Sequence, residues 1–285
     1  MNYKLKLCIQ IAIMSSLLLK NGCVPRRLIV NHPNLVNNFY FEPKLAKGRN
    51  LSQSDLSDKR ELLKLKVQYA YYKLEQGDRF FDEDFHNGID CYKVAFSVLK
   101  DAVNLGTENL KSKYKTFDNW VNSENDTIMF TDNDLYDLYW LGAAYGGLIK
   151  SSRGDPFEIV KLPKIGKILN SASSINHEWN DGVLHSALLA YTATRVDLSD
   201  EELLEIADKH YTIAISLSDS LDASPFVTYA ESIDKKFQNR NEFLKKLDYA
   251  ISIDVDKKKE IRMGNIISQD RAKWLLTKTD EYFFE

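Results

Sequence analysis

The sequence predicts an all-α fold made of stacked helical hairpins. Glycine and proline are scarce, at 12 and 6 of 285 residues, whereas an architecture of many short strands would need more turn residues. From Asp55 onward, apolar residues recur at helical rather than alternating spacing. One pattern of small and large residues also recurs along this region. We therefore expect a helical domain over residues 55–285.

The N-terminal residues 1–22 have the composition of a secretory signal peptide. Lys4 and Lys6 precede an apolar stretch shorter than the roughly 20 residues of a membrane-spanning helix. Gly22 before Cys23 fits a lipoprotein cleavage site, at which the cysteine is lipidated, although Lys20 is unusual there. Ordinary cleavage nearby is the alternative. The expected location is the periplasm, with the protein tethered to the membrane through Cys23.

Residues 23–54 differ in composition from the rest of the chain. They contain three of the six prolines and show no sustained period, so we expect a lipid tether followed by an irregular segment. If Cys8 leaves with the signal and Cys23 carries lipid, Cys91 is the remaining thiol and no internal disulfide forms. The 38 basic and 41 acidic side chains are nearly balanced, which argues against a nucleic-acid partner.

A small–large–small spacing indicates helices that pack closely in pairs. Ala207, Tyr211 and Ala214 have the spacing of the second helix of a tetratricopeptide (TPR) hairpin. Similar triplets are Gly88–Tyr92–Ala95, Ile165–Leu169–Ala172 and Phe243–Leu247–Ala250. We predict TPR-like repeats that form an α-α superhelix, with a capping helix at about 261–284. An ordinary helical bundle is the alternative.

The first helix of each hairpin is expected in 55–76, 132–152, 181–195 and 224–237. Good N-caps are Ser54 or Asp55, Asp132 or Asn133, and Ser199. Pro156, Pro163 and Pro225 fit the first turn of a helix, where a missing N–H does no harm. Residues 102–132 are expected to form an insertion with weak helical character.

No catalytic, metal or cofactor motif is evident. His177 and His185 are eight residues apart, whereas two metal ligands on one helix face are four apart. We therefore expect neither an enzyme, nor a metal site, nor a cofactor. A helical hydrolase or lyase with unrecognised residues is the contrary hypothesis.

Two groups of residues are candidates for binding or for structural roles. TPR arrays bind on the inner face built by first helices; the groove candidates there are Tyr136, Trp140, Tyr145, His185 and Tyr191. The alternative is that these large side chains belong to the core. A second group forms either a hydrogen-bonded lock to the capping helix or a partner contact: Arg262, Asn265, Gln269 and Arg271.

Several segments resemble the T-component (TatT) family of tripartite ATP-independent periplasmic (TRAP) transporters. The resemblance lies in LYWLGAAYGGLIKSSRGD, in the helix with Gly182 and His185, and in a closing section with Arg262, Asn265 and Gln269 in matching places. It covers about 135–276 and extends more loosely back to 62. It implies a periplasmic lipoprotein of TPR-like repeats, often a homotrimer. It also implies association with the solute-binding P-component and a hydrophobic cleft for an apolar organic acid or lipid.

The function expected from these observations is that of a non-enzymatic lipoprotein accessory component of a TRAP-type uptake system. It would dock the periplasmic solute-binding protein and hold or pass an apolar ligand. The alternative is a general TPR scaffold for protein–protein interaction in the cell envelope.

Overall fold

The computed structural model describes residues 41–49, 55–123 and 127–284. The predicted signal peptide, Cys23 and most of the predicted tether lie outside these residues. The chain divides into two compact units, Met1–Gln53 and Ser54–Glu285; in the first, the structure describes α4 (Glu42–Arg49). Each regular element in the described residues is a helix, so the predicted all-α class is confirmed. Within these ranges no helix is both long enough and apolar enough to cross a membrane.

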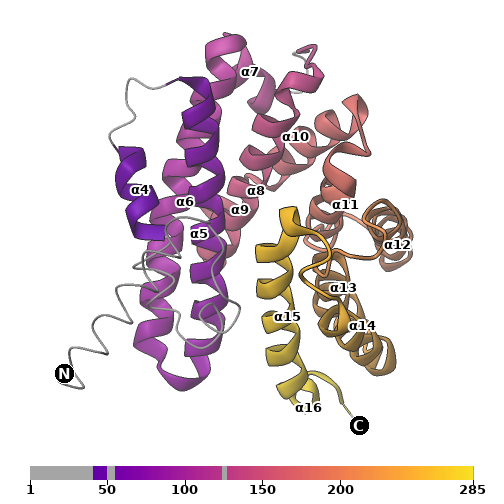
Figure 1. Ribbon diagram of the computed structural model, residues 1–285. Helices are drawn as coiled ribbons and strands as arrows, with labels where there is room; N and C mark the ends of the chain where they lie inside the picture. Colours follow the sequence, from indigo (N-terminus) through magenta and orange to yellow (C-terminus); the bar gives the residue numbers. More distant parts are fainter. Residues whose placement is uncertain (1–40, 50–54, 124–126, 285) are drawn as a thin grey trace, which may run out of the picture. The chain divides into compact units, whose positions relative to one another are not determined.

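The second unit begins with two long helices that pack along one another, α5 (Leu56–Glu83) and α6 (Phe85–Lys113) (Figure 1). The next two long helices, α8 (Leu135–Ser151) and α10 (Leu162–Ile175), extend this group, with α8 contacting both α5 and α6. Short helices precede α8 and α10: α7 (Phe117–Asn122), η2 (Asp132–Asp134) and α9 (Pro156–Ile159).

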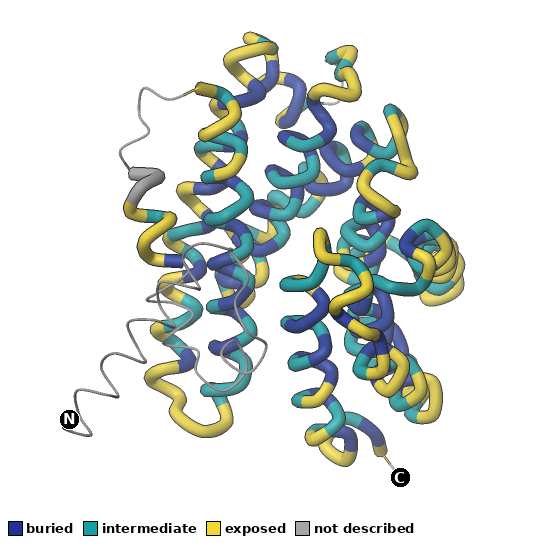
Figure 2. The backbone as a smooth tube through the Cα atoms, in the orientation of Figure 1, coloured by how far each residue is buried: buried dark blue, intermediate teal, exposed yellow. Residues whose placement is uncertain are grey.

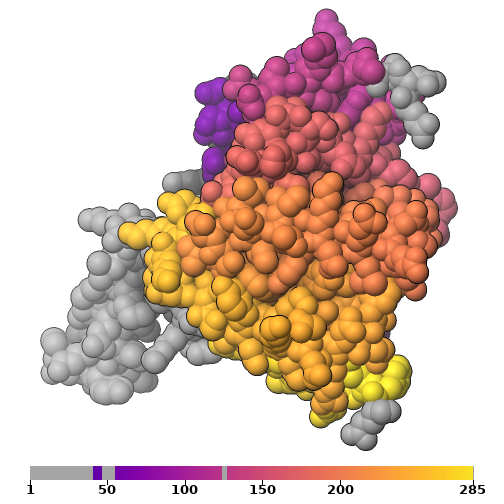
Figure 3. All heavy atoms as spheres, turned by 90° about the vertical axis from the view of Figure 1, so that its right-hand side faces the viewer, coloured from indigo at the N-terminus to yellow at the C-terminus, as the bar shows by residue number. Residues whose placement is uncertain are grey.

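The C-terminal half continues the pairing. Helix α11 (Trp179–Thr192) packs on α12 (Asp200–Leu217), and α13 (Ser224–Tyr229) runs into the π-helical turn η3 (Ala230–Asp234) before α14 (Arg240–Ser252). After η4 (Lys259–Ile261), α15 (Arg262–Thr277) packs on α14 and is followed by α16 (Thr279–Tyr282). Seen from the side of α12, residues from about 100 to the C-terminus succeed one another down the surface (Figure 3). Consecutive helical pairs therefore lie next to one another in chain order; the superhelix itself stays a prediction.

Most helix starts agree with the local signals; before α8, however, the capping box is formed by Thr131 and Asp134 rather than by Asp132 or Asn133. The Asp55 carboxylate accepts a hydrogen bond from the backbone N–H of Leu56. Ser199 and Glu202 form a reciprocal capping box at the start of α12. Pro156, Pro163 and Pro225 each stand in the first turn of a helix, as predicted.

The repeated triplets mark buried helix faces. Ala207 and Ala214 are almost fully buried, and the Tyr211 ring packs against α13 with its centroid 4.8 Å from that of Tyr229. A Cβ on Gly182 of α11 would lie 3.3 Å from the Cα of Ala214, so α11 and α12 approach closely there. Buried positions line the facing sides of the helices while exposed positions lie outside (Figure 2).

The prediction for residues 102–132 is wrong in its first part. Helix α6 continues to Lys113, and Ala102, Gly106 and Leu110 are buried along it. Gly106 weakens the helical signal in the sequence. In the structure a Cβ at this glycine would lie 3.1 Å from a Leu141 methyl group, so the missing side chain admits α8. Tertiary packing thus favours a residue that local propensity does not.

Candidate functional site

An open pocket of about 450 Å³ lies where the first and last long helices of the second unit meet. It is lined from α5, α6, the end of α8, η3, α15 and α16. Its five cations are Lys150, Arg153, Lys235, Arg271 and Lys278. Its four carboxylates are Asp78, Asp82, Glu231 and Glu281. Four aromatic rings complete the lining: Phe81, Tyr92, Trp274 and Tyr282.

Arg271 is the centre of a buried ion network beside the pocket. Its side chain is 7% exposed, and its Nε donates to a Glu231 carboxylate oxygen at 3.2 Å while Nη2 bonds the other oxygen. Its Nη1 lies 2.8 Å from Asp78 Oδ2 and 3.3 Å from Glu75 Oε2. Lys150 Nζ approaches the same Asp78 oxygen at 3.5 Å. The network therefore joins α5, α8, η3 and α15.

The charges in this network shift one another's protonation. Burial would raise the pKa of Asp78 and of Glu231, but the nearby cations outweigh burial and lower both. For Glu75 burial prevails and raises the pKa, against the opposing effect of Arg271 and Lys150. Burial would lower the pKa of Lys150 and of Arg271, but the carboxylates raise both. Both cations therefore stay charged at neutral pH.

Aromatic rings hold the cations of the pocket in place. The Arg153 guanidinium carbon lies 3.9 Å from the Phe81 ring centroid and 5.3 Å from that of Tyr92. Lys235 Nζ lies 4.5 Å from the centroid of Tyr282. Such stacking orients a cation without neutralising its charge. The pocket thus combines flat apolar walls with oriented positive charge, which suits an amphipathic ligand.

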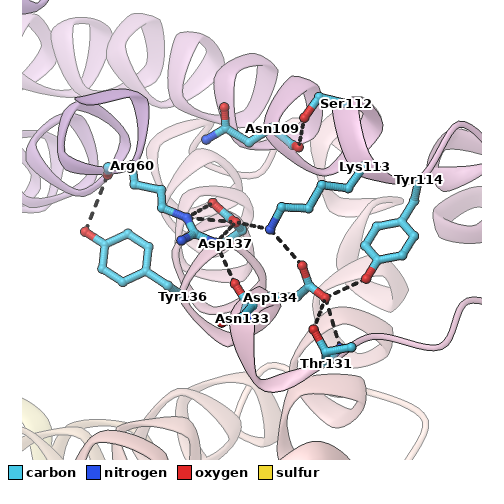
Figure 4. A network of polar contacts seen from close by, with 10 residues as sticks. All are labelled: Arg60, Asn109, Ser112, Lys113, Tyr114, Thr131, Asn133, Asp134, Tyr136 and Asp137. Carbon is cyan, nitrogen blue, oxygen red and sulfur yellow. Dashed lines mark hydrogen bonds and ion pairs between the residues drawn. The ribbon is translucent and has the colours of Figure 1, made fainter. Parts of the chain in front are cut away.

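A second polar network lies at the start of α8 (Figure 4). The fully buried Asp137 carboxylate accepts hydrogen bonds from Arg60 Nε at 3.0 and 3.2 Å and from Arg60 Nη2 at 2.6 Å. Asp134 accepts from Lys113 at 2.9 Å and from the Tyr114 hydroxyl at 2.6 Å. Because these carboxylates are already bonded to side chains of α5 and α6 and of the segment after α6, we assign this network to holding α8 in place.

The predicted groove residues lie outside the pocket. Tyr136 and Trp140 are neighbours on α8, with ring centroids 6.1 Å apart, and the Tyr136 hydroxyl donates to Glu61 at 3.3 Å. Tyr145 is buried in the core. Tyr191 packs over Gly166, where an added Cβ would lie 2.5 Å from the tyrosine hydroxyl. Of the five candidates, the structure therefore brings only Tyr136 and Trp140 together. Tyr136, Tyr145 and Tyr191 contact other helices or the core instead of lining the pocket.

His185, the fifth candidate, is buried in a group of three histidines. Its Nδ1 lies 2.9 Å from Nδ1 of His210, and its ring centroid is 5.7 Å from that of His177. Burial, together with the neighbouring histidine and Lys209, lowers the pKa of His210 to about 4. In the part of the chain that the structure describes, no group of three His, Cys, Asp or Glu side chains has the geometry of a metal site.

The four polar residues of the closing section divide into two roles. The Asn265 side-chain oxygen accepts from the backbone N–H of Ala223 at 2.8 Å, and its amide nitrogen donates to the Leu221 carbonyl at 2.7 Å. Gln269 donates to three backbone carbonyls at the end of α14 and just after it. Both residues thus tie α15 to its neighbours.

Arg262 and Arg271 lie apart from those two contacts. Arg262 bonds Asp256 at 2.6 Å near the surface, and Arg271 alone of the four lines the pocket. Sequence reasoning missed the other pocket residues, such as Lys150, Glu231 and Lys235. Arg153 had one signal, its place at a helix end before Gly154, but that position predicts only a favourable helix dipole.

The fold and the pocket together define the class of this protein: an all-helical protein of stacked hairpins with an open pocket lined by charged and aromatic side chains. The model of the TRAP transporter T-component family (TAtT) matches residues 61–283. The chain therefore belongs to the TRAP transporter T-component family. It is also 22% identical over 236 aligned residues to an uncharacterized protein of Treponema pallidum (strain Nichols), and the match covers 78% of this chain and 71% of that protein. Family membership makes it an accessory component of TRAP transport.

Proposed function

We propose that the protein is a non-enzymatic lipoprotein of the periplasm that docks the solute-binding P-component of a TRAP system near the membrane. The observation that carries this proposal is the family match, which spans nearly all of the helical unit. A lipid on Cys23 would keep the docking surface at the membrane. Tethering raises the effective concentration of a partner without any new contact.

The pocket supports a second part of this function, the holding of a small ligand. Small-molecule sites usually have volumes of about 300–1,000 Å³, and this pocket has about 450 Å³. Its lining is more charged than the apolar cleft that the family resemblance implies. The proposed ligand is therefore an organic acid rather than a neutral lipid.

Crosslinking in intact cells followed by purification of a tagged full-length chain tests the docking proposal. We expect a periplasmic solute-binding protein among the crosslinked partners, and the mass of the purified protein to correspond to a homotrimer. An unrelated tagged lipoprotein is the control for capture by the membrane itself. Repeated recovery of other envelope proteins instead would favour the general TPR scaffold and reject docking.

Replacing Cys23 tests the anchor separately. The variant Cys23→Ala should move from the membrane fraction to the soluble periplasmic fraction. Cys91→Ala removes the other cysteine of the mature chain and should leave the protein on the membrane, because Cys91 is a free, half-buried thiol of α6. Retention on membranes of a Cys23→Ala protein from which the signal peptide has been removed would exclude a lipid on Cys23 as the anchor.

A further inference from the structure

The carboxylates that line the pocket already have cationic partners. Asp78 and Glu231 bond Arg271, and Asp78 also lies near Lys150. Asp82 and Glu281 both pair with Lys278, at 2.8 and 2.9 Å. Each of the four lining carboxylates therefore already contacts one of three lining cations, Lys150, Arg271 or Lys278, and none is left unpaired for a cationic ligand.

Two cations of the lining are left without a carboxylate. Among the residues that the structure describes, neither Arg153 nor Lys235 forms an ion pair, and the contacts found for their charged groups are with aromatic rings. They come from different parts of the chain, since Arg153 follows α8 and Lys235 follows η3. Within the described residues the pocket thus presents two oriented cations that have no direct carboxylate contact, although the charge of Lys235 contributes to the lowered pKa of Glu231.

The rings beside these cations form the apolar part of the pocket. Phe81 and Tyr92 lie under Arg153, and Tyr282 lies under Lys235. Trp274 is held by Arg271, whose guanidinium carbon is 4.4 Å from the indole centroid. Aromatic walls favour a flat apolar body, while charge-assisted hydrogen bonds from Arg and Lys favour a carboxylate or a similar anion.

We propose that this pocket binds an organic anion with a flat apolar body, whose charged group is bound by Arg153 and Lys235. The inference rests on the proposed function in one respect, that the bound anion is the cargo of the uptake system. It excludes a purely apolar cargo, because such a ligand would cover both cations without replacing the water that solvates them.

Isothermal titration of the full-length protein with three probes tests the chemical class. The probes are 1-naphthylacetate, the neutral 2-(1-naphthyl)ethanol and acetate. We expect 1-naphthylacetate to bind, the alcohol to bind at least about tenfold more weakly, and acetate to give no measurable heat. Binding of the acid should also weaken as salt is added, since ions screen exposed charges. Failure of the acid to bind at about 1 mM, or equal binding of the alcohol, would overturn the proposal.

Substitutions locate the site. Lys235→Gln and Arg153→Gln should each weaken 1-naphthylacetate binding by about tenfold or more. The matched control is Lys236→Gln, because Lys236 pairs with Asp200 and does not line the pocket; its affinity should equal that of the wild type. Wild-type affinity in both pocket variants would place the anion elsewhere. The crosslinking result does not depend on these titrations, so docking and ligand binding can fail separately.

Discussion

Replacing Arg271 by methionine should destabilise the helical unit strongly. Removing one partner of a buried ion pair leaves the other charge uncompensated, which costs about 3–5 kcal/mol. Here Arg271 is the shared partner of Glu75, Asp78 and Glu231. Because Lys150 stays near Asp78, we expect the lower end of that range, about 3 kcal/mol. For a unit of this size the melting temperature should fall by about 6–12 °C.

Urea and thermal unfolding followed by circular dichroism measure this effect at neutral pH. Arg240→Met is the matched control, because Arg240 pairs with Asp280 at the surface, where side chains are 41% and 89% exposed. Such exposed pairs contribute less than about 1 kcal/mol. A loss in Arg271→Met no larger than in Arg240→Met would refute the idea that the network stabilises the fold.

The pH dependence of the Arg271 effect gives a second check. In the wild type the pKa values of Asp78 and Glu231 are lowered. Their stabilising contribution is therefore present above their ordinary pKa values and is lost as pH falls through the lowered ones. The difference between wild type and Arg271→Met should shrink on acidification to about pH 4 and below. A difference independent of pH would show that lost packing, not charge, causes the effect.

Three further substitutions test other parts of the structure. The pKa of His210 is lowered from 6.5 to about 4, so on acidification the unfolded chain takes up a proton that the folded chain does not. The free energy of unfolding should therefore fall by about 1–2 kcal/mol between about pH 7 and pH 4, after allowance for the partial exposure of the ring. His210→Asn should flatten the pH dependence of urea unfolding, and an unchanged slope would contradict this. Gly182→Ala should lower the free energy of unfolding by about 1–3 kcal/mol, because φ at Gly182 is +84° and the new Cβ would lie 3.0 Å from the Cβ of Leu217. The control Gly264→Ala should be neutral or stabilising, because no atom lies within 4 Å of its new Cβ. Asp137→Asn should cost about 3 kcal/mol in urea unfolding, since a neutral amide cannot balance Arg60 and Lys113, and a change within about 0.5 kcal/mol would count against that network.

Local signals in the sequence were enough to predict the class of the fold and most helix starts. The caps at Asp55 and Ser199 and the prolines in first turns depend on atoms within one helical turn, so they can be read without knowing what packs nearby. The triplet of Ala207, Tyr211 and Ala214 likewise identified a helix face that is packed against its neighbours. Where the local signal was weak, at Gly106, the prediction failed because the packing of α8 decided the outcome.

The aromatic groove candidates show where sequence reasoning stopped. Periodicity assigned Tyr145 and Tyr191 to helix faces, but it did not tell which helix would cover those faces. The structure covers Tyr145 with the core and packs Tyr191 over Gly166. Neither side chain reaches the pocket, since spacing along one helix reports burial and not the identity of the neighbour.

The sequence alone therefore determined that this chain is all-α, built of closely packed helical pairs, and similar to TRAP T-components. Only the tertiary structure decided where its pocket lies. Glu75 and Asp78 meet Arg271 across almost 200 residues of sequence, and Arg153 and Lys235 reach the pocket from two further segments. The physical reason is that ion pairs and pockets depend on which helices stack together, whereas helix formation depends on neighbours within a few residues.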